Sequence, residues 1–119
     1  MKDIIRIFVY ETLRKGFGLN RYMDNFKYLG VGILKNFDMY SNGYFPMIKK
    51  GSGEIIGEVY EIENGKNEIV VLDQIENAYT RTKVKVKLNN VLTDAETYVY
   101  NGNITNLKPI KSGNWILQV

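Results

Sequence analysis

Two short segments of this 119-residue chain contain the side chains best suited to chemistry. The first is the loop of residues 10–16, which follows an apolar segment, Ile4–Val9, with the pattern of a buried strand. The second, residues 72–76, ends in Glu76. A loop that ends a strand can offer backbone N–H donors to a carbonyl oxygen or a carboxylate, and a carboxylate opposite that loop can move a proton. We therefore expect an acid–base site built from these two segments.

The chain contains neither His nor Cys, which limits the chemistry available to it. A Ser-His-Asp triad, a Cys-His pair, a thiolate or imidazole metal site and a redox disulfide cannot be built. A general acid or base has to be Asp, Glu, Lys or Tyr. The carboxylates are dispersed along the sequence, so we expect no metal and no other cofactor.

Charge and hydropathy restrict the partners. The net charge of +3 is mild, and the alternating residues Lys83, Lys85 and Lys87 have the pattern of a solvated strand face. Nucleic-acid-binding surfaces usually gather basic residues more densely, so no nucleic-acid partner is expected. The N-terminal apolar stretch is short and interrupted by Arg6, unlike a signal peptide, and no run approaches the ~20 apolar residues of a membrane span. These features predict a soluble, cytoplasmic protein without a membrane partner; they leave the oligomeric state open.

The elements that would position the two segments are mostly strands. Two helices are expected, a clear one over Lys66–Ile75 and a short one over residues 19–28. A turn is expected at residues 41–43 and a hairpin connection at residues 89–94. Strand patterns are found at Ile4–Val9, residues 29–40, residues 52–62, Tyr79–Leu88 and residues 95–101.

About six strands and one or two short helices that do not alternate with them predict an α+β fold. The architecture expected is a small, mostly antiparallel β-barrel, formed by residues 1–119 as a single domain.

A set of motifs, spread over nearly the whole chain, resembles the gamma-glutamylcyclotransferase superfamily, including its gamma-glutamylamine cyclotransferase and AIG2-like branch. Each motif is modest alone, but their order and spacing together are fairly specific. They are Phe-Val-Tyr-Glu-Thr-Leu-Arg-Lys-Gly at 8–16, Tyr-Phe-Pro-Met at 44–47, Gly-Glu-Val-Tyr-Glu-Ile at 57–62, Leu-Asp-Gln-Ile-Glu at 72–76, Tyr-Thr-Arg at 79–81, Tyr-Val-Tyr at 98–100 and Ile-Lys-Ser-Gly-Asn-Trp at 110–115.

The resemblance implies a small closed barrel with a cavity beside the first-strand loop. It also implies a reaction in which the free α-amine of a gamma-glutamyl compound attacks its own γ-carbonyl, giving 5-oxoproline and a free amine or amino acid. By the resemblance, Glu76 is the catalytic residue that shuttles the proton, and the glutamyl part of the small-molecule substrate is held by Tyr10, Glu11, Thr12 and Leu13.

Physical chemistry is consistent with the role of Glu76 and leaves an alternative. Glu76 directly follows the expected helix, where the negative end of the helix dipole and partial burial would both raise the pKa of a carboxyl group toward that of a useful base. From position alone, a solvated Glu in a surface loop is the commoner case.

The neighbouring candidates carry alternatives of the same kind. Tyr10 could be a core aromatic residue at a strand end, and Thr12 could hydrogen-bond its own turn. Arg14 could anchor a carboxylate or be exposed to solvent. Three further tyrosines, Tyr44, Tyr79 and Tyr98, could line the cavity or simply pack.

Glu11 stands where the motif of the family has Gly. A Gly there would allow a positive φ or a close approach of the backbone to a ligand, and a carboxylate there would repel the α-carboxylate of a gamma-glutamyl substrate. Either Glu11 points away and catalysis persists, or it fills the pocket and selects a cationic ligand or abolishes turnover. A non-catalytic small-molecule-binding protein of the same fold is therefore the alternative to an enzyme. Single-stranded nucleic-acid binding by a small basic barrel is a third, less favoured hypothesis.

Overall fold

The computed structural model describes residues 3–115. The elements of this part of the chain are β1 (Ile4–Val9), a 3-10 helix η1 (Gly18–Met23), β2 (Lys27–Ser41), β3 (Pro46–Glu63), α1 (Lys66–Ile75), β4 (Tyr79–Leu88), β5 (Val91–Tyr100) and β6 (Lys108–Ile110). The predicted small α+β fold with a mostly antiparallel sheet is confirmed. Within residues 3–115, no helix has the length and apolar character needed to cross a membrane.

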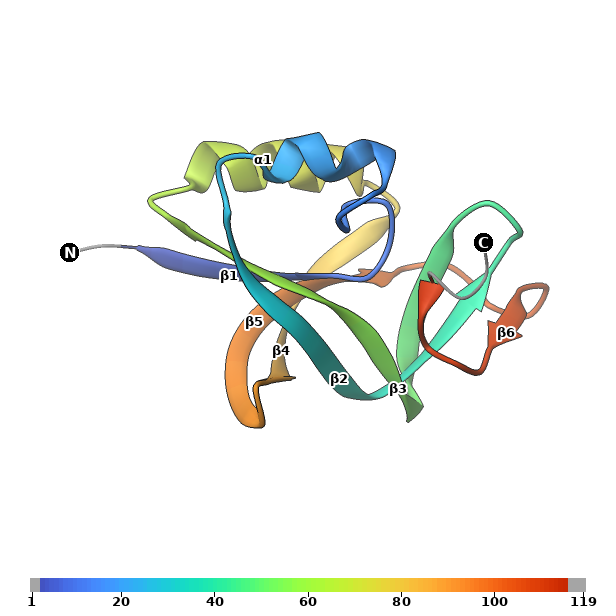
Figure 1. Cartoon of the computed structure of the whole chain (residues 1–119). Coiled ribbons are helices and arrows are strands. Elements are labelled where there is room, and N and C mark those ends of the chain that lie inside the picture. The colour runs from blue at the N-terminus through green and yellow to red at the C-terminus, as the bar shows by residue number, and fades with distance from the viewer. Residues whose placement is uncertain (1–2, 116–119) are drawn as a thin grey trace.

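The strands form one sheet that returns on itself. Its order is β3-β1-β5-β4-β2-β6, and an additional pairing between β2 and β3 links five of the strands into a closed cycle. Only the contact of β1 with β5 is parallel. In Figure 1, α1 and η1 lie on the same side of β1, while the far ends of β2 and β3 extend away from them and carry β6. The end of β1 is thus brought close to the end of α1.

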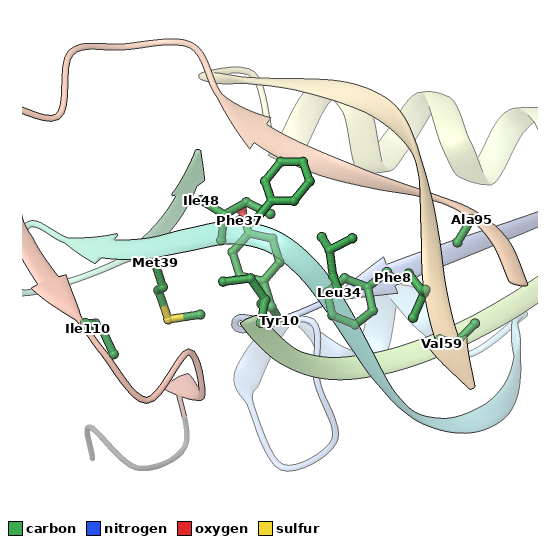
Figure 2. Close-up of a cluster of buried hydrophobic side chains, with 11 residues drawn as sticks. Phe8, Tyr10, Leu34, Phe37, Met39, Ile48, Val59, Ala95 and Ile110 are labelled. Carbon is green, nitrogen blue, oxygen red and sulfur yellow. The ribbon is translucent and has the colours of Figure 1, made fainter. Parts of the chain in front are cut away.

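The second half of β1, residues 7–9, is buried on both faces, which explains its run of apolar residues. Alternate residues Phe8 and Tyr10 belong to a core cluster inside the cycle of strands, shown in Figure 2, and Ile7 and Val9 belong to a second cluster under the helices. The other buried members of the first cluster are Leu34, Phe37, Met39, Ile48, Ile55, Val59, Val86, Ala95 and Ile110. Those of the second cluster are Leu13, Met23, Phe26, Tyr60, Ile62, Ile69, Leu72 and Tyr98.

Gly57 of β3 lets the end of β1 come close. A Cβ atom at this position would lie 2.4 Å from the carbonyl oxygen of Val9 and 2.6 Å from the ring of Phe8. Because only Gly fits this contact, β1 and β3 can pair as far as Val9 and Glu58. The loop of residues 10–16 therefore begins directly beside Glu58.

Several expected boundaries are wrong. The connection between β4 and β5 is the two-residue turn Asn89-Asn90, with φ of 51° and 64°, so residues 91–94, expected in the connection, belong to β5. The helix expected over residues 19–28 is the shorter η1, because residues 27 and 28 pair with β3. β3 begins at Pro46 rather than at residue 52, and the short strand β6 was not expected.

Candidate active site

The ends of β1 and α1 meet at a pocket of about 350 Å³. It brings together Glu11 and Thr12 of the loop with Glu76, more than sixty positions further along the chain. The remaining wall comes from η1, from the connection between β2 and β3, and from the strand ends that follow α1. The pocket is lined by Glu11, Thr12, Leu19, Asn42, Phe45, Met47, Ile75, Glu76, Asn77, Ala78, Tyr79 and Tyr100.

Glu76 lies at the C-cap position of α1, where its N–H donates to the carbonyl oxygen of Leu72 at 2.9 Å. Its side chain is only 5% exposed. The alternative of a solvated surface Glu is therefore wrong, and the carboxyl group faces the pocket from a fixed helix end.

The last turn of α1 is tied to the sheet by Asp73. Its Oδ1 accepts hydrogen bonds from the Tyr98 hydroxyl at 2.7 Å and from Arg81 Nε at 3.0 Å. Arg81 also donates to Glu96 at 2.7 Å. This network joins α1 to β4 and β5 one turn before Glu76, so it positions the Glu76 carboxyl group.

Glu11 and Glu76 form a carboxyl pair. Glu11 is also 5% exposed, and its side chain is hydrogen-bonded to that of Glu76. Burial raises the pKa of the Glu11 carboxyl well above its ordinary value of 4.5, and the hydrogen bond and the negative charge of Glu76 raise this pKa further. Glu11 therefore holds its proton more tightly than an ordinary carboxyl group does. Because Glu11 lines the pocket, the idea that its side chain points away is wrong.

The backbone accommodates Glu11 without strain. The described non-glycine residues with positive φ are Asn36, Asn64, Asn89 and Asn90, and Glu11 is not among them. The chain therefore replaces the Gly of the motif with an ordinary conformation at this position, and the consequence of the replacement is a filled and acidic pocket wall.

The other predicted loop residues take different places. Thr12 lines the pocket, whereas Tyr10 and Leu13 lie in the core beneath it, each 1% exposed. The Tyr10 hydroxyl donates to the carbonyl oxygen of Tyr98 at 2.6 Å. No acceptor within residues 3–115 is hydrogen-bonded to the N–H groups of Thr12 and Leu13. Contact of these four loop residues with a substrate stays a prediction.

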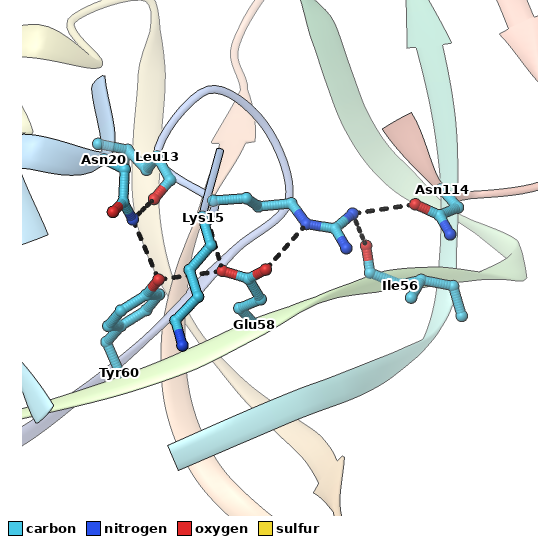
Figure 3. A network of polar contacts seen from close by, with 8 residues as sticks. Leu13, Lys15, Asn20, Ile56, Glu58, Tyr60 and Asn114 are labelled. Carbon is cyan, nitrogen blue, oxygen red and sulfur yellow. Dashed lines mark hydrogen bonds and ion pairs between the residues drawn. The ribbon is translucent and has the colours of Figure 1, made fainter. Parts of the chain in front are cut away.

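Arg14 holds the loop to the rest of the fold (Figure 3). It is 4% exposed, so the expectation of an exposed Arg is wrong. Its Nη1 donates to Asn114 Oδ1 at 3.0 Å and to the carbonyl oxygen of Ile56 at 3.4 Å, and its Nε lies 3.6 Å from Glu58 Oε2. Arg14 is thus occupied by internal partners and does not line the pocket.

Among the tyrosines proposed for the cavity, only Tyr79 lines it. Tyr44 is 79% exposed and Tyr98 is buried in the core. Tyr79 donates to the carbonyl oxygen of Pro46 at 2.9 Å, and its ring packs edge to face on that of Tyr100, with centroids 5.8 Å apart. Tyr100 was missed as a lining residue; the structure places it directly opposite Tyr79 in the pair of β4 and β5.

A larger pocket of about 700 Å³ lies elsewhere, between β2 and β4. It is lined by five lysines, and Phe37, its single aromatic residue, is buried and offers no exposed ring for stacking on a base. It contains no member of the carboxyl pair. We therefore place the candidate active site at the smaller pocket, where the buried carboxyl groups of Glu11 and Glu76 lie beside the loop of residues 10–16.

Comparison with known proteins agrees with this fold. A small α+β fold whose mostly antiparallel sheet returns on itself defines the structural class. Residues 7–117 match the family described as gamma-glutamyl cyclotransferase, AIG2-like, and the chain belongs to this family.

The chain is 34% identical over 113 residues to the Escherichia coli (strain K12) gamma-glutamylcyclotransferase family protein YtfP, covering 94% of this chain and 96% of YtfP. The crystal structure of PH0828 from Pyrococcus horikoshii superimposes with a TM-score of 0.82 at 30% identity, covering 96% of this chain and 92% of PH0828. The solution structure of E. coli ytfP gives a TM-score of 0.74 at 33% identity, covering 96% and 98%.

Proposed function

We propose that the chain is an enzyme that cyclises a gamma-glutamyl amide or related compound. The α-amine of the substrate attacks its γ-carbonyl carbon, and 5-oxoproline and a free amine or amino acid are released. The observation that carries this proposal is the buried carboxyl group of Glu76 at the wall of the pocket, in a chain that belongs to the gamma-glutamyl cyclotransferase family.

The reaction suits a site without His or Cys, because nucleophile and electrophile belong to one substrate molecule. The protein has to fold the substrate so that its amine meets its carbonyl carbon, an orientation worth up to ~7–11 kcal/mol. A well-placed base adds roughly 10²–10⁴ in rate, and a donor to the developing oxyanion adds about 3–4 kcal/mol.

In the proposed mechanism Glu76 accepts a proton from the attacking amine. The new C–N bond forms the five-membered ring, and the negative charge on the carbonyl oxygen is stabilised by the N–H groups of Thr12 and Leu13. The bond to the leaving nitrogen then breaks, and Glu76 returns the proton to that nitrogen. No water is consumed. Tyr10 and Leu13 would shape the loop from below, while Glu11 and Thr12 would contact the glutamyl part.

A non-catalytic binding protein is the second candidate, and one specific observation favours it. Glu11 occupies pocket wall that Gly would leave open, and its side chain is hydrogen-bonded to that of Glu76, the residue that has to act as the base. If this bond persists when a ligand is bound, the pocket holds the ligand without turning it over.

Incubation with a panel of gamma-glutamyl amines, amino acids and dipeptides, followed by mass-spectrometric detection of 5-oxoproline, tests the proposal. Glu76→Gln should lower kcat/KM by about 10²–10⁴ because it removes the base. The matched control is Glu54→Gln, an exposed residue of β3 outside the pocket, which should keep the native activity. Absence of product from every substrate with a folded native chain would favour the binding protein instead.

A further inference from the structure

The carboxyl groups of the described lining residues face no cationic side chain within the same lining. Glu11 and Glu76 are both nine-tenths buried, and no Lys or Arg is found among the described lining residues. Arg14, the nearest cation along the loop, is engaged with Glu58 and Asn114. Lys49 lies outside the lining, with its Nζ 5.9 Å from the centre of the Tyr100 ring.

This distribution of charge is unfavourable for one particular substrate group. In a gamma-glutamyl compound the attacking amine and the α-carboxylate are attached to the same carbon atom. If the amine is close enough to give its proton to Glu76, the carboxylate is brought within a few ångströms of the carboxyl pair. An ionised Glu11 would repel it, and a protonated Glu11 would still take the space that Gly leaves free.

The amine itself is favoured by the same groups. An ammonium ion beside Glu11 and Glu76 gains two acceptors in a buried site, and its charge compensates that of the pair. The pocket is therefore complementary to an amine that has no carboxylate beside it.

We propose that this pocket takes amides of 4-aminobutyric acid, which have the chain length and amine of a gamma-glutamyl amide but lack its α-carboxylate. The inference rests on the cyclisation proposed above and makes Glu11 the residue that determines the substrate class. The 4-amino group attacks the amide carbon, the ring closes, and the C–N bond to the leaving amine breaks. Glu76 carries the proton from the attacking to the leaving nitrogen, and the products are 2-pyrrolidinone and a free amine.

Two substrates with the same leaving group test the proposal: N-butyl 4-aminobutanamide and the γ-butylamide of glutamic acid. Each is incubated with the native chain, and 2-pyrrolidinone and 5-oxoproline are measured by mass spectrometry. We expect kcat/KM to be at least about tenfold higher for the 4-aminobutanamide, because a like-charge contact in a buried site weakens binding at least that much.

Two variants of Glu11 test whether its side chain causes this substrate preference. Glu11→Gly restores the open wall and should raise kcat/KM for the gamma-glutamyl substrate by about tenfold or more, while lowering it for the 4-aminobutanamide. Glu11→Gln keeps the volume and removes the ionisable carboxyl group; it should shift the preference in the same direction by a smaller factor. This second variant decides the question if the Gly variant does not fold.

The outcomes separate the two proposals. Faster turnover of the gamma-glutamyl substrate by the native chain, or an unchanged preference in both variants, would overturn the role of Glu11 and leave cyclisation intact. Absence of both products from the folded native chain and from both variants would remove cyclisation itself, and the inference with it.

Discussion

Glu58 and Glu11 are both buried carboxyl groups beside the loop of residues 10–16, and they are stabilised in opposite ways. Glu58 is 6% exposed, and its Oε1 accepts hydrogen bonds from the Lys15 N–H at 2.9 Å and from the Tyr60 hydroxyl at 3.0 Å, while its Oε2 faces Arg14 (Figure 3). For Glu11, burial raises the pKa of the carboxyl group well above its ordinary value, and the neighbouring acid Glu76 raises it further. One carboxyl group is compensated by the protein and the other is not.

The difference separates a structural site from a reactive one. A buried charge with a cation and donors around it is satisfied, so it has no further interaction to offer. The buried Glu11–Glu76 pair faces a pocket, and no Lys or Arg is found among the lining residues in the described part of the chain. The Arg14–Glu58 group therefore fixes the loop, and the Glu11–Glu76 pair is free to interact with a ligand.

The largest effect is expected from removing the compensating cation. Arg14→Met leaves Glu58 buried without its partner and should lower the free energy of unfolding by about 3–5 kcal/mol. The measurement is urea denaturation. Arg21→Met, a change at an exposed Arg of η1, is the matched control and should stay within about 0.5 kcal/mol of the native value.

A double variant shows whether charge is the cause. Replacing Glu58 by Leu as well removes the uncompensated carboxylate and should recover part of the stability lost in Arg14→Met. If the double variant is less stable than Arg14→Met by the full cost of a second core substitution, the two groups are not coupled and the comparison fails.

The second effect concerns the uncompensated pair and depends on pH. The pKa of Glu11 is raised in the folded protein, so its proton stabilises the fold fully below the unfolded value of about 4.5, and this contribution is lost as the pH rises toward the folded-state pKa. The native chain should therefore lose up to about 1.4 kcal/mol per pH unit in this range relative to Glu11→Gln.

Urea denaturation of both chains at a series of pH values measures this difference. Glu54→Gln, which removes an exposed carboxyl group, should follow the native profile. Parallel profiles of the native chain and Glu11→Gln would mean that Glu11 titrates as an ordinary carboxyl group and that the pair does not exist.

The comparison also shows how far the sequence can be interpreted alone. The bounds of α1 and β4 follow from local periodicity, and both were predicted correctly because each has one apolar face and one polar face. The connection expected at residues 89–94 was too long because the first half of β5 is largely exposed and contains the polar residues Thr93 and Asp94, which a search for turn residues interprets as loop.

For the site, the sequence indicates candidates but not their surroundings. The place of Glu76 at the end of α1 follows from the helix pattern, whereas its burial depends on Glu11, far away along the chain. Arg14 was expected at the surface because its partner Asn114 is 100 residues away, and no local pattern brings the two together. Charge compensation is a property of the tertiary structure, so it could not be predicted.

The smallest effects are expected from removing one hydroxyl group in each region. Tyr60→Phe takes one donor from the ionised Glu58 and should cost about 1.5–3 kcal/mol of stability, since hydrogen bonds to charged groups are the stronger kind. Tyr79→Phe removes only a bond to the carbonyl oxygen of Pro46, worth about 0.5–1.5 kcal/mol. Urea denaturation measures both, with Tyr44→Phe as the exposed control.

Tyr79→Phe should lower activity more than Tyr60→Phe does, which is the reverse of their expected effects on stability. Tyr79 lines the pocket and holds β4 to the start of β3, so Tyr79→Phe should lower kcat/KM even though it costs little stability. Tyr60 contacts Glu58 and Asn20 outside the pocket, so Tyr60→Phe should keep kcat/KM near the native value wherever it is folded. If the variant that loses more stability also loses more activity, the loop network and the pocket act as one unit. Opposite rankings would show that the satisfied carboxylate maintains the fold while the unsatisfied pair performs the chemistry.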